Sequence, residues 1–180
     1  MASRLELPID SVVAPESYQA MKKLLAIASL GMGLLAATAA VADGTIYYGS
    51  RVGMEVDVVS MSGLNTSNAV IHTKHTPKNA ARFCREYAKD RSKSCIQSTL
   101  ATRLNNQVTG NCKTGEFTDF YGHRYRMEGR NTDPDSMAKF RLVDLATNEV
   151  ADGSSASGYP TNMQIFAALC PATAPREANF

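Results

Sequence analysis

Residues Gln107 to Glu128 read QVTGNCKTGEFTDFYGHRYRME, and this stretch decides the fold. Apolar and polar residues alternate in it with the period of two that marks a β-strand with one exposed face. Turn residues at 113–115 and 122–123 divide it into strands at 107–112, 116–121 and 124–128. After a loop at 131–136, a further strand at 138–145 and a turn at 146–149 lead to Asp152. The pattern predicts an antiparallel meander of about four strands from Gln107 to Asp152.

A hairpin is expected upstream of the meander. Ile46 to Ser50 is a short apolar and aromatic run, and Met54 to Val58 alternates apolar with acidic residues. Turn residues around Gly63 precede Ala69 to Lys74, which reads as the returning strand. This hairpin can extend the same sheet.

Three helices are predicted by capping signals. Thr76-Pro77 opens the first, which presents Ala80, Phe83, Cys84, Tyr87 and Ala88 on one face and pairs Arg82 with Glu86 one turn later. Ser94 with Gln97, and Thr161 with Gln164, have the spacing of capping boxes. The predicted helices cover Pro77 to Lys89, Cys95 to Arg103 and Asn162 to Leu169. The fold class expected is therefore α+β, an antiparallel β-meander packed with about three short helices.

An export signal is predicted at residues 21–42. Met21 is followed by two lysines, a long uncharged run and the small residues Ala40-Val41-Ala42, as a signal peptidase requires. The alternative is a retained membrane anchor, but the run is rich in alanine and glycine rather than leucine and phenylalanine. We expect cleavage after Ala42, so that only the uncleaved form contacts a membrane.

Residues 1–20 are interpreted as an upstream extension from a misassigned start. They contain Glu6, Asp10 and Glu16, whereas the start of an export signal is short and positive. A short extension that still permits export is the alternative. Residues 43–180 are then a single mature domain, and we expect it in the periplasm or secreted.

All four cysteines follow the predicted cleavage site, which favours disulfide bonds in an oxidising compartment. Three pairings are compatible with four cysteines. We favour Cys84 with Cys95, because a short connection can fold one helix back on the next. Cys112 with Cys170 would then tie the last helix to a strand.

The composition argues against several classes of partner and cofactor. The formal net charge is only +2, and removing residues 1–42 removes as many basic as acidic residues, so nucleic acid is not an expected partner. The cysteine and histidine spacings do not match a zinc site. His72 and His75 lie three apart on a strand and would point to opposite faces, so we expect solvated or edge histidines. No metal or cofactor is expected.

Three segments resemble a group of small exported envelope proteins of alphaproteobacteria that have no known activity. They are Asn111 to Thr118 with Tyr121-Gly122, Asp152 to Pro160, and Phe166 to Pro171. The resemblance implies an envelope protein and implies no reaction. Ser155 to Tyr159 is also similar, in a different residue order, to the serine- and glycine-rich loop of periplasmic lysozyme inhibitors.

Two candidate binding sites follow from the sequence. One is the hairpin cluster Tyr121, His123, Arg124, Tyr125 and Arg126, whose flat rings and guanidinium groups suit a cell-wall glycan or an envelope protein. The other is the loop with Ser154, Ser155 and Ser157, which runs into a helix and can hold an anion or a sugar hydroxyl. Ordinary capping of a loop, and polar side chains that are simply solvated, explain both with fewer assumptions.

The function expected from the sequence is a non-catalytic envelope protein, structural or binding. The serine-rich loop lacks the flanking glycines of a nucleophile elbow, and no catalytic residues can be named. A small periplasmic hydrolase, or an inhibitor of a cell-wall-degrading enzyme such as lysozyme, is the alternative. A cleft shared by Asp119, Asp152, His123 and the hydroxyls of residues 154–157 would favour the hydrolase.

Overall fold

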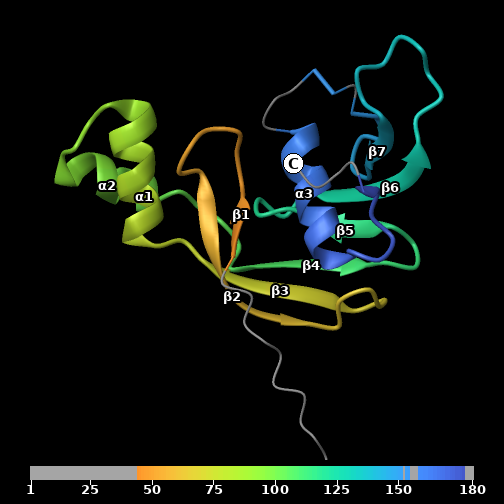
Figure 1. Cartoon of the computed structure of the whole chain (residues 1–180), viewed down its shortest axis with the longest axis horizontal. Coiled ribbons are helices and arrows are strands. Elements are labelled where there is room, and N and C mark those ends of the chain that lie inside the picture. Colours follow the sequence, from red (N-terminus) through yellow and green to blue (C-terminus); the bar gives the residue numbers. More distant parts are fainter. Residues whose placement is uncertain (1–43, 152, 155–157, 177–180) are drawn as a thin grey trace, which may run out of the picture. The chain divides into compact units, whose positions relative to one another are not determined.

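The computed structural model describes residues 44–151, 153–154 and 158–176, and its centre is an antiparallel sheet of seven strands (Figure 1). The strands follow one another across the sheet in chain order. They are β1 (Thr45–Tyr47), β2 (Glu55–Ser62), β3 (Ala69–Lys74), β4 (Gln107–Asn111), β5 (Glu116–Thr118), β6 (Arg124–Arg130) and β7 (Phe140–Asp144). The α+β class and the meander are confirmed, and the N-terminal hairpin extends the same sheet.

The strand ends differ from the prediction where local chemistry intervenes. β2 runs on to Ser62 through a register shift between Val58 and Ser60, which leaves Val59 half exposed. β5 stops at Thr118 because Asp119 starts a turn. Towards Asp152 the predicted meander continues in the described residues as a single bridge between Val150 and Val143 rather than as a further strand.

The helix α3 (Tyr159–Leu169) packs on the inner face of the sheet (Figure 1). It contacts β1, β3 and β4, and its Phe166 ring lies 5.5 Å from that of Phe117 in β5. The Phe140 amide in β7 donates to the Tyr159 hydroxyl at 2.9 Å. Because β1 and β7 are the two edges, the sheet curls around α3.

The main core fills the space between α3 and the sheet. Its fully buried members include Ile71, Val108, Leu142, Met163, Ile165 and Leu169. Gly110 permits the close approach, because a β-carbon there would lie 3.1 Å from a Leu169 methyl group. The predicted buried side of this helix, Ile165, Phe166 and Leu169, is confirmed.

The start of α3 was predicted wrongly. The helix begins at Tyr159 with Pro160 in its first turn, so Thr161 is already inside it and does not cap it. A similar shift affects α2 (Lys93–Leu100), in which Ser92 and not Ser94 accepts the Cys95 amide. Asp90 fixes this earlier start, because its carboxylate accepts both the amide and the hydroxyl of Ser92.

The first predicted helix is two elements. Thr76 caps α1 (Pro77–Phe83) as expected, and a π-helical segment, η3 (Cys84–Ala88), follows before Lys89 turns left-handed. The wider turn rotates Tyr87 and Ala88 away from the predicted buried face, and both are exposed. α1, η3 and α2 together form what we call the helical hairpin.

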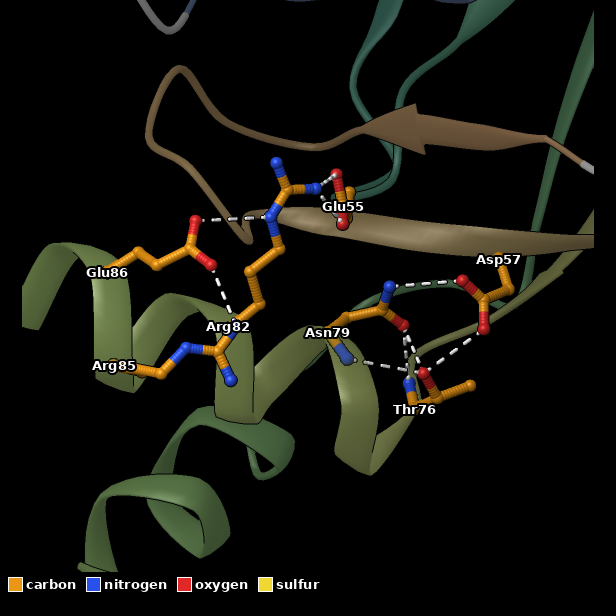
Figure 2. A network of polar contacts seen from close by, with 7 residues as sticks. All are labelled: Glu55, Asp57, Thr76, Asn79, Arg82, Arg85 and Glu86. Atoms are coloured by element: carbon orange, nitrogen blue, oxygen red, sulfur yellow. Dashed lines mark hydrogen bonds and ion pairs between the residues drawn. The ribbon is translucent and has the colours of Figure 1, made fainter. Parts of the chain in front are cut away.

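Polar contacts join the helical hairpin to β2 (Figure 2). The Asn79 side chain, which is fully buried, donates to Asp57 at 3.0 Å, and its amide oxygen accepts the Thr76 backbone N–H. Arg82 binds the buried carboxylate of Glu55 at 2.8 Å. The predicted pair of Arg82 with Glu86 is confirmed at 3.4 Å.

Both predicted disulfide bonds are present. Cys84–Cys95 closes the helical hairpin over 11 residues, and Cys112–Cys170 joins the sheet to the end of α3 over 58 residues. Across the described part of the chain, no helix is long and apolar enough to cross a membrane. Residues 1–43, which include the predicted export signal, lie outside the described residues.

Candidate functional site

A turn built around Asp119 positions the site. One carboxylate oxygen of Asp119 accepts the backbone N–H groups of Tyr121 and His123, each at 2.8 Å, and the Asp119 amide donates to the His123 carbonyl. Gly122 takes the left-handed conformation that the turn requires. The turn therefore holds Tyr121 and His123 over one buried negative charge.

Asp119 and His123 form a dyad. The second carboxylate oxygen of Asp119 lies 3.1 Å from His123 Nδ1. The Asp119 side chain is 8% exposed, whereas that of His123 is 62% exposed. When the neutral imidazole donates from Nδ1 to the carboxylate, Nε2 is left as an acceptor.

The dyad stands at a hollow of about 170 Å³, which we call the tyrosine pocket. Its described lining consists of Tyr48, Asp119, Phe120, Tyr121, His123, Tyr125, Gly158, Thr161, Asn162 and Ile165. The His123 ring lies 6.3 Å from the Tyr121 ring, nearly parallel to it, and 6.5 Å from the Tyr125 ring, edge-on. Aromatic rings from β6, from the Asp119 turn and from the segment after β1 thus meet the first turn of α3.

The polar groups of the pocket differ in whether the described part of the protein already hydrogen-bonds them. The Tyr125 hydroxyl is hydrogen-bonded to the Asn162 side chain. Tyr48 and Thr161 are 4% and 6% exposed, and no hydrogen bond to the described part of the chain engages their hydroxyls. The hydroxyls of these two buried residues are therefore available to a ligand.

The tyrosines keep their protons at neutral pH. Burial, supplemented by Tyr121 and Glu55, raises the pKa of Tyr48 to about 12. Burial is also the largest cause of the raised pKa values of Tyr121 and Tyr125, and the Asp119 carboxylate adds to both. The phenols can therefore donate as well as accept hydrogen bonds in the pocket.

The predicted hairpin cluster is divided between two faces of the sheet. Tyr121, His123 and Tyr125 line the tyrosine pocket, whereas Arg124 and Arg126 alternate to the other face. There Arg124 pairs with Glu116 and Arg126 pairs with Glu128. Arg124 belongs to a separate, shallow groove of about 330 Å³ that also includes Thr109 and Thr118.

The serine-rich loop can be placed only in part. Ser154 is exposed and is not among the described lining of the tyrosine pocket. Asp152, Ser155 and Ser157 lie outside the described residues. Among the groups whose shared cleft would favour a hydrolase, Asp119 and His123 lie together in the described structure.

Sequence reasoning missed Tyr48, Thr161 and Asn162 as pocket residues. Tyr48 lies about seventy residues before the hairpin cluster, and no local pattern links the two. Thr161 and Asn162 were expected as helix cap and helix start. Their burial follows from the early start of α3, which a single sequence does not show.

His75 departs from the prediction of solvated or edge histidines, while His72 is exposed as expected. Both ring nitrogens of His75 are buried without a hydrogen-bond partner in the described structure, and burial lowers the pKa of this imidazole. Its ring packs edge-on against Tyr48 at 5.3 Å. Among the described residues no three histidine, cysteine, aspartate or glutamate side chains gather as a metal site would require.

No protein-family model, no curated protein and no solved structure matches this chain. The assignment of a function therefore depends on the geometry of the site.

Proposed function

We propose that the protein is a non-catalytic binding module of the cell envelope, exported by cleavage near Ala42, which recognises a cell-wall glycan or an envelope protein. The observation that carries the proposal is the tyrosine pocket, in which the hydroxyls of two buried residues, Tyr48 and Thr161, lie among aromatic rings. Aromatic walls with a few placed polar groups are the usual composition of a small-ligand site. The two disulfides are compatible with an oxidising compartment.

The size of the pocket limits what it can take. At about 170 Å³ it is smaller than the roughly 300–1,000 Å³ of sites that enclose a whole small molecule. It has room for one ring or for the end of one chain. This suits a larger partner that presents a single group, as a glycan or a protein does.

The proposal is tested by recovery of partners from envelope extract and purified peptidoglycan. Wild type, Tyr121→Ala and the double variant Arg124→Ala/Arg126→Ala are immobilised in parallel. Because the tyrosine pocket and the two arginines lie on opposite faces, Tyr121→Ala should lose the partner and the double variant should keep it. Equal recovery by all three proteins would contradict a role for the pocket.

Export is tested separately by the N-terminal sequence of the protein recovered from the envelope. The expected start is at or near Asp43. A protein that keeps residues 21–42 in the membrane fraction would contradict export by cleavage.

A hydrolase is the second candidate, and the dyad is the observation that favours it. A buried carboxylate bonded to Nδ1 orients a histidine as a general base, with Nε2 free to activate water. The expected result is no turnover of chromogenic ester and glycoside substrates above that of His123→Ala. Turnover by the wild type that is lost in His123→Ala would favour the hydrolase over the binding module.

A further inference from the structure

The walls of the tyrosine pocket are suited to a cation. Tyr48, Tyr121 and Tyr125 contribute phenol rings, and Phe120 adds a fourth aromatic ring. The faces of such rings carry partial negative charge and attract ammonium groups within about 6 Å of their centroids. Tyr121 remains 47% exposed, so one wall is open to an arriving ligand.

The charges around the pocket are negative. Asp119 is the charged residue of its described lining, which includes neither lysine nor arginine. Asp144 also acts on Tyr125 from outside the lining, as does Glu55 on Tyr48, although the Glu55 charge is paired with Arg82. A phosphate or carboxylate ligand would meet like charge here.

The N-terminus of α3 opposes this preference, because Gly158, Thr161 and Asn162 also line the pocket. A helix N-terminus is equivalent to roughly half a positive charge, which is less than the full charge of the Asp119 carboxylate. Pro160 removes one amide from this helix end, and the Asn162 amide is already bonded to the Gly158 carbonyl at 3.0 Å. The carboxylate therefore dominates.

The available polar groups include several acceptors. His123 Nε2 accepts when Nδ1 donates to Asp119, and the hydroxyls of Tyr48 and Thr161 accept with their oxygens. A primary ammonium group brings three donors, whereas a quaternary one brings none. The acceptors thus favour the primary group.

Building on the proposed function, we propose that the group recognised by the tyrosine pocket is a primary ammonium on a short stem, held between the phenol rings and the Asp119–His123 dyad. An amino sugar and an amine-bearing peptide side chain both offer this chemistry, and each could belong to an envelope partner.

The test uses small probes, of which propylammonium, propanol and propionate differ mainly in the charge of one end group. Propylammonium, tetramethylammonium, propanol, propionate and N-acetylglucosamine are titrated into the mature protein, and the NMR signals of the tyrosine rings report binding. Propylammonium should bind about tenfold more tightly than propanol, from one ring contact and one carboxylate. Tetramethylammonium should bind more weakly than propylammonium, and added salt should weaken both.

Two variants locate the effect. Asp119→Asn keeps the oxygen that accepts the turn amides and removes the charge, so it should abolish the preference for propylammonium over propanol. Glu149→Gln, an exposed acidic residue outside the pocket, is the matched control and should leave the preference intact. If Asp119→Asn loses its native circular dichroism spectrum, Tyr121→Leu at the half-exposed wall takes its place and should weaken propylammonium binding.

The outcomes separate this inference from the proposed function. If propanol or N-acetylglucosamine moves the same tyrosine signals as strongly as propylammonium, the ammonium is excluded and the binding module stands. If no probe binds while Tyr121-dependent recovery of an envelope partner succeeds, the ammonium is again excluded. An affinity for propylammonium that does not fall when salt is added would also contradict recognition of an ammonium group. If all five probes and the envelope recovery fail, both proposals fall together.

Discussion

The helical hairpin and α3 are held to the same sheet by different forces. α3 is largely apolar around its circumference and is buried along most of its length in the main core. The helical hairpin contributes none of its residues to that core cluster and is joined to β2 by charged and amide groups (Figure 2). One attachment depends on burial of apolar area, and the other depends on directed hydrogen bonds.

This difference implies a difference in response to conditions. Apolar burial is hardly affected by salt at moderate concentration, whereas contacts between charged groups weaken with salt. We therefore expect the hairpin to open locally while the core around α3 persists.

The largest effect is expected from Phe166→Ala. Phe166 is 2% exposed and packs on Phe117, so its truncation leaves a cavity and should lower the free energy of unfolding by about 3–5 kcal/mol. Urea denaturation followed by circular dichroism measures it, and the loss should be the same at low and high salt. A loss that depends on salt would contradict the view that α3 is held by burial of apolar area.

Removing the disulfides one at a time compares the two regions directly. In the chain-entropy model Cys112→Ala/Cys170→Ala should cost about 4 kcal/mol and Cys84→Ala/Cys95→Ala about 3, because the first closes the longer loop. Denaturation of both variants under one condition gives the order.

The order of reduction gives an independent check on the same two bonds. Cys112 and Cys170 are both buried, whereas Cys95 is partly exposed. A mild thiol should therefore open Cys84–Cys95 first. Peptide mapping that finds Cys112–Cys170 reduced first would contradict the picture of a tight core and a looser hairpin.

A smaller loss is expected from Asn79→Ala. The change removes the bond to Asp57 and the acceptor of the Thr76 amide, which should cost about 1–3 kcal/mol. Lys78→Ala, at an exposed neighbouring position, is the control and should be near neutral. Hydrogen exchange should show faster exchange in α1 and α2 with α3 unchanged. Equal acceleration in all three helices would show that the hairpin does not open by itself.

The smallest effect concerns pH and His75, which lies at the joint between β3 and α1. Burial lowers the pKa of His75, so the unfolded chain binds the proton more readily than the folded one. The contribution of His75 to the free energy of unfolding is complete above pH 6.5, roughly the pKa of histidine in the unfolded chain. It declines as the pH falls below that pKa. His75→Phe should lose less stability than wild type between pH 7 and pH 5 in urea denaturation. Identical losses in both proteins would remove His75 as a pH-sensitive point of the joint.

The sequence was most informative where one local rule decided the structure. Alternation located β3 and β4, and Thr76-Pro77 located the start of α1. Both disulfide pairings followed from the order of the elements. Apart from the Cys112–Cys170 pairing, which spans 58 residues, each of these inferences needs only residues that are near one another in the chain.

Prediction failed where a contact or an alternation that the sequence analysis did not weigh selects between local options. Both Ser92 and Ser94 can cap a helix, and the carboxylate of Asp90 selects the first. The hairpin cluster was treated as one site, although alternation along β6 separates Tyr125 from Arg124 and Arg126. Tyr48 reaches the tyrosine pocket because the sheet curls, and no local sequence pattern predicts that curvature.

The Cys112–Cys170 bond has a consequence for cleavage by proteases. It closes a covalent ring that contains β5, β6, β7 and α3, and within that ring lie Asp119, Tyr121, His123, Tyr125, Thr161 and Asn162. A single cut in the exposed segment 132–135 would open the backbone inside the ring without releasing either piece. Such a nicked molecule would run as one species until reduced, because the piece that carries Tyr48, Tyr121 and His123 would stay bonded through Cys112 to the piece that carries Thr161 and Asn162.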